Sequence, residues 1–211
     1  MIRKILYSIS FALFSFNSFA QENVSIGPVI GLNYSTVSNN SAAEFKAGFV
    51  GGIFANYSTK TDFGFNGSLI FSQLGNNVEN SDNYLTLNYL QVPINLVYYF
   101  GEGMREGSFR PKLFIGPYIG YLVSAKSPGF TNEQTLTFFN SLDFGANIGA
   151  GFNYAIKNKT WLNVDLKYGY GFANIPKDGS VLSKFQNRTI NLNAGISFPL
   201  GTYDKNTGKM K

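Results

Sequence analysis

The fold is decided by the stretch 142–173, with the sequence LDFGANIGAGFNYAIKNKTWLNVDLKYGYGFA. From Leu142 to Ile156 every second residue is apolar, and after a polar segment at 157–160 the alternation resumes and continues to residue 173. A period of two over this length is typical of β-strands, and two such runs joined by a short polar turn predict a hairpin. Each run spans about 13 to 15 residues, whereas a tilted membrane-spanning strand needs ~9–11. The predicted hairpin is therefore long enough to cross a bilayer.

The polar face of this hairpin indicates which side faces lipid. It consists mostly of Gly, Asn and Ala, with Asp143, Asp165, Lys157 and Lys167 as the charged exceptions. A soluble surface is expected to be roughly a quarter or more charged. Small residues suit the crowded lumen of a narrow barrel, and the Leu, Ile, Phe and Tyr of the other face suit hydrocarbon. A membrane β-barrel is therefore favoured over a soluble barrel, the alternative that has the same period.

The N-terminal segment has the pattern of a secretory signal peptide. Arg3 and Lys4 precede an apolar run at 5–16, and small residues stand at Ser18 and Ala20. This pattern predicts cleavage between Ala20 and Gln21. The alternative, a membrane anchor helix, is less favoured because the apolar run is shorter than the ~20 residues required. We therefore expect a signal peptide at 1–20, an outer-membrane barrel at 21–200 and a short periplasmic tail at 201–211.

The composition narrows the chemistry. The chain has 211 residues, no Cys and no His, which excludes disulfides, thiolate metal sites and a histidine base or metal ligand. The formal charge of +5 falls to +3 when the two basic residues of the predicted signal peptide are removed. No basic cluster is interleaved with aromatic residues, so nucleic-acid binding is not expected. We expect no cofactor, no metal and a monomer.

The whole chain predicts an all-β fold, an eight-stranded antiparallel up-and-down transmembrane barrel. The predicted strands lie at 24–35, 45–57, 63–72, a fourth ending at 90–100, 112–125, 142–156, 161–173 and 188–200. Two of the turns after even-numbered strands, 58–62 and 157–160, are short, and the connections on the other side are longer. Short periplasmic and long outer connections are typical of outer-membrane barrels, so both termini are expected in the periplasm. Aromatic residues near the strand ends predict two girdles at the membrane interfaces. One consists of Tyr57, Phe63, Tyr98, Phe100, Tyr154 and Phe198, and the other of Tyr34, Phe71, Tyr121 and Phe172.

The fourth strand breaks the alternation. Leu85 and Leu87 are out of phase with Leu90 and the apolar residues that follow it. This offset predicts either a β-bulge near Asn88 or a pairing that differs above the membrane. Pro93 cannot donate to the sheet, so it marks a further irregularity.

The interior is predicted to be filled by side chains, as in other barrels of eight strands. Many inward positions are glycine, and we expect them to make room for Phe54, Phe114, Tyr118 and Trp161. If Lys157 pairs with Trp161 across the turn, Asp165 faces Asn153 and Asp143 faces Ile175, which separates the two carboxylates by ~33 Å and excludes a catalytic pair. Asp165 and Lys167 share the inner face two residues apart, and we expect them to form an ion pair.

Several short segments along the chain carry a family resemblance: YLQVPI at 89–94, YYF at 98–100, GPYIGYLVSAK at 116–126, DFG at 143–145, YGYGFANI at 168–175 and NRTINL at 187–192. In this order they resemble the PorT family of outer-membrane β-barrel proteins from Bacteroidetes. The resemblance covers about residues 24 to 198. It implies an outer-membrane barrel and, through the founding member, a link to protein secretion. The tail after Phe198 departs from the pattern, because such barrels usually end near the terminal aromatic residue.

The function hypothesis centres on the outer loops. Loop 126–141 carries Phe130, Leu136, Phe138 and Phe139, and loop 174–186 carries Ile175, Val181, Leu182 and Phe185. Exposed apolar residues on a rim predict a partner-binding surface, and the alternative is that the two loops pack together as a lid. We therefore expect a non-enzymatic, structural, partner-binding or secretion-accessory barrel surrounded by lipid and lipopolysaccharide. A lipid-modifying outer-membrane enzyme and a narrow channel are the alternatives.

Overall fold

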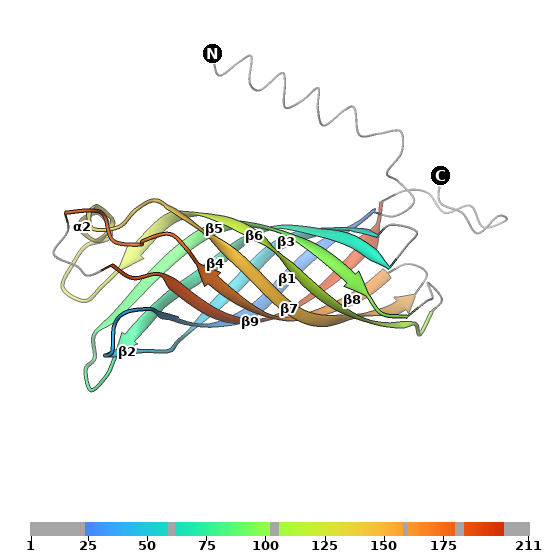
Figure 1. Cartoon of the computed structure of the whole chain (residues 1–211), viewed down its shortest axis with the longest axis horizontal. Helices are drawn as coiled ribbons and strands as arrows, with labels where there is room; N and C mark the ends of the chain where they lie inside the picture. The colour runs from blue at the N-terminus through green and yellow to red at the C-terminus, as the bar shows by residue number, and fades with distance from the viewer. Residues whose placement is uncertain (1–23, 59–61, 102–105, 158–159, 180–183, 201–211) are drawn as a thin grey trace, which may run out of the picture.

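The described part of the chain is a closed barrel of eight antiparallel strands (Figure 1). The structure is a computed structural model, and it describes residues 24–58, 62–101, 106–157, 160–179 and 184–200. The predicted signal peptide, its cleavage site and the tail at 201–211 lie outside these ranges. The described residues contain no helix with the length and apolar character needed to cross a membrane.

The barrel strands are 12 to 18 residues long, and each pairs with its neighbours along the chain. They are β1 (Val24–Val37), β3 (Lys46–Ser58), β4 (Phe63–Val78), β5 (Tyr84–Tyr99), β6 (Phe109–Lys126), β7 (Leu142–Lys157), β8 (Thr160–Gly171) and β9 (Asn187–Pro199). Pairing of β1 with β9 closes the barrel and leaves no free edge in it. A ninth strand, β2 (Ala43–Glu44), pairs with the far end of β4 outside the barrel, and a short helix, α2 (Asn132–Thr137), lies between β6 and β7.

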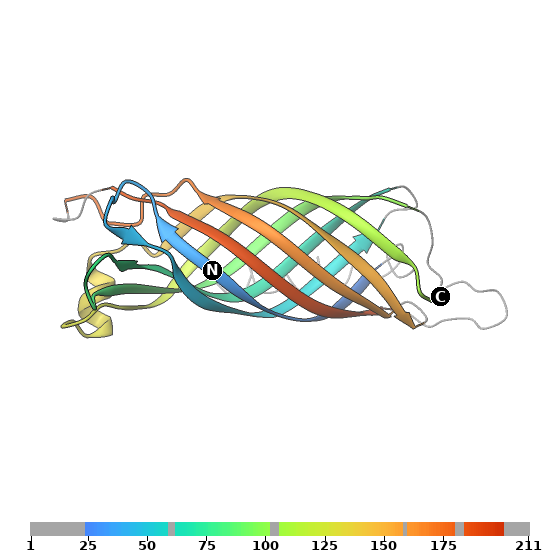
Figure 2. The same ribbon diagram turned by 90° about the horizontal axis from the view of Figure 1, so that it is seen from below.

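The two ends of the barrel differ in their connections (Figures 1 and 2). We call the end with α2, β2 and segments 38–45, 79–83, 127–141, 172–179 and 184–186 the loop end. The opposite end, where β1 starts and β9 finishes, is the turn end. This asymmetry agrees with the predicted alternation of short turns and long loops.

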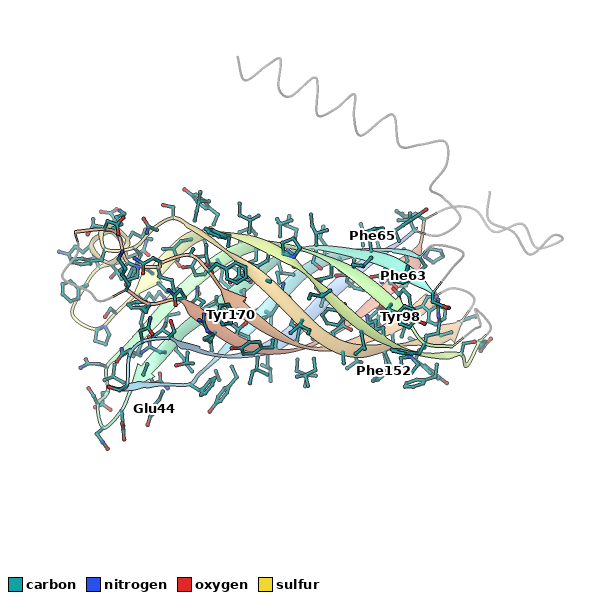
Figure 3. All side chains as sticks on the ribbon, in the orientation of Figure 1. Glu44, Phe63, Phe65, Tyr98, Phe152 and Tyr170 are labelled. Atoms are coloured by element: carbon teal, nitrogen blue, oxygen red, sulfur yellow. The ribbon has the colours of Figure 1, made fainter. Side chains whose placement is uncertain are left out.

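Apolar side chains cover the outside of the strands, as the sequence predicts. Residues in alternate positions are exposed, for example Leu166, Leu192 and Phe144, each 54% exposed, while their neighbours along the strand point inward. Phe63, Phe65, Tyr98 and Phe152 lie towards the turn end, and Tyr170 lies towards the loop end (Figure 3). In water such a surface would be costly, at roughly 25 cal/mol per Å² of apolar area, whereas hydrocarbon accommodates it.

The hairpin of β4 and β5 is longer than predicted. The third strand was predicted to end at residue 72, but β4 continues to Val78 and only residues 79–83 connect it to β5. The predicted bulge is confirmed, because the pairing of β5 with β6 shifts between Asn88 and Tyr89. Beyond the bulge the paired residues Leu74 and Leu87 point inward and are buried. The apolar side of the hairpin therefore changes from outside to inside at this level, as expected where the surroundings change from lipid to water.

Candidate functional site

Apolar side chains close the loop end of the barrel. We call this cluster the loop-end plug, and its buried members are Val37, Leu74, Leu87, Tyr89, Leu122, Ala125, Phe139, Ile175 and Phe185. They come from β1, β4, β5, β6 and both long loops, so strand ends and loops form one core. This core therefore lies at the loop end of the barrel, where the strand ends and both long loops pack together.

Local hydrogen bonds hold the long loops over the plug. Helix α2 begins with a capping box in which Thr131 Oγ1 accepts from the Gln134 amide and Gln134 Oε1 accepts from the Thr131 amide, at 3.3 and 2.9 Å. The Asn140 side chain donates to the carbonyls of Asn174 and Pro176 at 3.0 and 3.1 Å. Asn140 therefore ties the loop that contains α2 to the loop before β9.

The four residues predicted as a partner-binding loop occupy different environments. Phe139 is buried in the plug, and Leu136 and Phe138 are partly buried against it. Phe130 is 55% exposed and touches Phe138 edge to face, with ring centroids 6.0 Å apart. The alternative of a lid therefore describes most of this segment, and Phe130 is the member that presents an accessible apolar surface. Val181 and Leu182 lie outside the described residues.

A pocket opens beside the plug, between the loop that carries α2 and the β4–β5 hairpin. Its volume is about 310 Å³. We call it the outer pocket, and it is lined by Asn40, Asn76, Val78, Asn83, Tyr84, Leu85, Ser127, Phe130, Thr135, Phe138, Phe139 and Phe185. The lining is therefore mainly aromatic and aliphatic, with amide and hydroxyl groups and no charged side chain among the described residues.

Charged residues meet inside the barrel, but not in the predicted pair. Lys112 Nζ of β6 lies 2.8 Å from Asp165 Oδ1 of β8, and these two residues form the interior ion pair that the structure describes. Both pair with Gly151 of β7, so they stand in one row across three strands. Gly151 has no side chain, so Lys112 reaches across it to Asp165. Sequence spacing along one strand predicted Lys167 as the partner of Asp165, and it does not show this cross-strand row, which brings Lys112 to Asp165.

Lys167 remains close to this ion pair. It is buried and lines the same small interior cavity as Lys112 and Asp165, which has a volume of about 30 Å³. A cavity of this size has room for only a water molecule or two. The described interior therefore contains two lysines and one aspartate in close proximity, in a space too small for a larger ligand.

The two interior carboxylates lie far apart, as predicted, although the register differs. The ladder between β7 and β8 has an irregularity between Ala155 and Lys157, so Lys157 pairs with Thr160 and Asp165 faces Gly151 instead of Asn153. Asp143 is eight residues from Gly151 on β7, or ~26 Å at 3.3 Å per residue. It accepts hydrogen bonds from Asn187 Nδ2 at 2.9 Å and Tyr118 Oη at 3.2 Å. The two carboxylates cannot act together on one substrate.

Aromatic rings pack over glycines in the lumen, as the sequence predicts. A Cβ atom on Gly149 would overlap the Phe114 ring, one on Gly145 would overlap the Tyr118 ring, and one on Gly195 would overlap the Phe54 ring. The first two are directly paired positions of β6 and β7. Glycine is therefore required here for close ring packing. Among the described residues no group of three or more carboxylate, His or Cys residues is placed to hold a metal ion.

Comparisons with known proteins agree with this architecture. Residues 19–176 match the family described as outer membrane protein beta-barrel domain. No curated protein matches the chain. Among solved structures, Neisserial surface protein A is 17% identical, with a TM-score of 0.56 and coverage of 84% of this chain and 99% of that one. OprG from Pseudomonas aeruginosa is 14% identical, with a TM-score of 0.50 and coverage of 84% and 94%.

A third similar structure is that of the outer membrane enzyme PagL, at 15% identity, a TM-score of 0.44 and coverage of 79% of this chain and 97% of that one. At these levels of identity the likenesses to Neisserial surface protein A and OprG show the shared fold and nothing about activity. The family match and the fold together place the barrel in an outer membrane.

Proposed function

The chain belongs to the outer membrane protein beta-barrel domain family, and we propose that it is a non-enzymatic barrel that binds a protein partner at its loop end. The observation that carries this proposal is the exposed ring of Phe130, held at the rim by a loop that the plug anchors. A rigidly supported aromatic side chain with an accessible face is typical of the residues that dominate protein interfaces.

The interior supports a non-catalytic and non-conducting barrel. Its described cavity of about 30 Å³ is too small for a substrate, and the plug lies between the lumen and the loop end. The chain has no histidine to act as a base near neutral pH. Asp143 is already hydrogen-bonded to Tyr118 and Asn187, and it lies far from Asp165. These features favour partner binding over the two alternatives, a lipid-modifying enzyme and a narrow channel.

We propose that the loop end faces the cell exterior and the turn end faces the periplasm. The long structured loops lie at the first end, and β1 starts and β9 finishes at the second. Outer-membrane barrels usually have short periplasmic turns and longer outer loops. In this orientation Phe130 is accessible from outside, and both termini are periplasmic.

A narrower proposal is that the protein serves secretion as an accessory component, as its resemblance to the PorT family implies. The segments that carry this resemblance include YLQVPI of β5 and GPYIGYLVSAK of β6, which pair with each other in the barrel. Deleting the gene should then reduce the amounts of particular proteins in the culture medium while the outer membrane stays intact. An unchanged set of secreted proteins would contradict this role.

Site-specific photocrosslinking tests the partner proposal. A photoreactive residue placed at position 130 in intact cells should yield a discrete adduct that disappears when an excess of unlabelled wild-type protein is co-expressed. The matched control is position 109, because Phe109 is 56% exposed but lies at the turn end. The same adducts from both positions, or none from position 130, would contradict the proposal.

A further inference from the structure

The outer pocket has the size of a small-molecule site and is open on one side. Its volume of about 310 Å³ lies at the lower end of the ~300–1,000 Å³ that such sites usually have. Phe139, Phe185 and Thr135 are each at most 8% exposed, so the inner wall is rigidly packed. The outer wall is formed by the β4–β5 hairpin and by Phe130. The plug therefore forms one wall of the pocket, and the walls come from more than one loop.

The pocket lies beyond the lipid-facing belt. The last apolar pair that β4 and β5 turn outward is Phe71 and Leu90, and beyond it Leu74 and Leu87 turn inward while Tyr84 stays 40% exposed. The pair Asn77 and Tyr84, next to the pocket, is six residues further along β4, or ~20 Å at 3.3 Å per residue. A ligand therefore reaches the pocket from water and not from the acyl chains of the membrane.

The lining specifies the chemistry of the ligand. Two edge-to-face pairs, Phe130 with Phe138 and Phe139 with Phe185, have ring centroids 6.0 and 6.4 Å apart. Such pairs leave ring faces and edges on which a further aromatic ring can pack. Exposed amides of Asn40 and Asn83 lie on the lining and can hydrogen-bond to a polar group of the ligand. Since no charged side chain lines the pocket, an ionised ligand would lose hydration without gaining a partner.

We propose that the outer pocket binds a small, uncharged aromatic molecule from the aqueous exterior, with its ring among the four phenylalanines and its polar group at the amides. This inference goes beyond the proposed function, because it requires no protein partner. The outer pocket is also separate from the small interior cavity near Lys112 and Asp165.

The test uses 5-fluoroindole, a neutral ring with one N–H donor, and the whole chain in lipid nanodiscs. Fluorine NMR of the probe should show saturable line broadening beyond that produced by empty nanodiscs. Asn83→Trp should fill the pocket and abolish the saturable component. Phe130→Ala should weaken binding about tenfold by removing one wall. The matched control Phe109→Ala removes an equally exposed ring at the turn end and should leave binding unchanged.

A charged analogue tests the specificity. The carboxylate 5-fluoroindole-3-acetate should bind at least tenfold more weakly than 5-fluoroindole. Equal binding by all variants, binding that does not exceed that of empty nanodiscs, or equal affinity for the carboxylate would each overturn the proposal. The readout uses no partner protein, so its failure is separate from a failure of the crosslinking experiment.

Discussion

Removing the interior ion pair one residue at a time should have unequal effects. Lys112 Nζ and Asp165 Oδ1 are 2.8 Å apart, and their side chains are 3% and 24% exposed. Lys167 lies two residues from Asp165 on the same face of β8, or ~7 Å along the strand. Asp165→Asn therefore leaves two buried lysines without an anion, whereas Lys112→Met leaves Asp165 with Lys167.

The size of the effect follows from this arrangement. Breaking a buried pair by removing one partner usually costs about 3–5 kcal/mol, and we expect Asp165→Asn to lie in this range. Lys112→Met should cost only about 1–2 kcal/mol, because Asp165 keeps a nearby cation and some solvent contact. The double variant should be more stable than Asp165→Asn by at least about 1 kcal/mol, because it removes the repulsion between the two lysines.

Equilibrium unfolding in urea with lipid vesicles measures these differences, and Trp161 is a built-in fluorescence probe because it is the sole tryptophan. Reversibility is checked by refolding from high urea. Equal destabilisation by Lys112→Met and Asp165→Asn would show that Lys167 does not compensate for the lost lysine. A double variant less stable than Asp165→Asn alone would show that the two lysines do not repel each other.

Three further predictions concern other parts of the barrel. Gly151→Ala should lower the free energy of unfolding by about 1–3 kcal/mol, because its Cβ would overlap Val164 O and Asp165. The control Gly67→Ala meets nothing within 4 Å and should stay within about 0.5 kcal/mol of wild type in the same urea assay. Equal effects of the two variants would contradict the packing around Gly151. Leu87→Ala should destabilise the plug by about 2–5 kcal/mol. Protease should then cleave segment 127–141 faster, while the barrel keeps its heat-modifiable mobility on gels. Unchanged cleavage would contradict a role of Leu87 in the plug. The guanidinium of Arg188 lies 3.5 Å from the Tyr170 ring centroid near the loop end, and we expect it to bind lipopolysaccharide phosphates. Arg188→Ala should therefore reduce the amount of lipopolysaccharide that copurifies, whereas Lys157→Ala at the turn end should not. Equal losses from the two variants would refute this role.

The barrel strands were predictable because their signal is local. Alternation along 142–173 reports the two faces of a strand directly, and the small residues of the polar face identify the lumen. The phase offset at Leu85 and Leu87 also located the bulge. These features depend on neighbours in sequence, so one chain is enough to read them.

Other features depend on what packs above the membrane. Segment 75–83 contains four Asn and one Gly and is typical of a loop, yet its first part, 75–78, belongs to β4 because the hairpin is covered by the long loops. Helix α2 was missed because six residues carry little periodicity. The spacing of Thr131 and Gln134, a capping box, was the signal that could have located it.

The site depended on register across several strands. The pairing of Lys112 with Asp165 requires that both face Gly151, and this follows only when β6, β7 and β8 are aligned. The irregularity at Ala155 moved that alignment by two residues from the one expected. The outer pocket was not predicted for the same reason, since its walls come from four separate segments.

Apolar side chains face lipid in this barrel, while glycine and amide groups fill its axis. The absence of cysteine allows single-cysteine nitroxide labels to be placed along β9, at 191–196, without background. Electron paramagnetic resonance should show high access to oxygen at Leu192, Ala194 and Ile196, and low access to both oxygen and a water-soluble nickel complex at the alternate positions. High access to nickel at Leu192, Ala194 and Ile196 would show that these residues face water, and it would contradict the account.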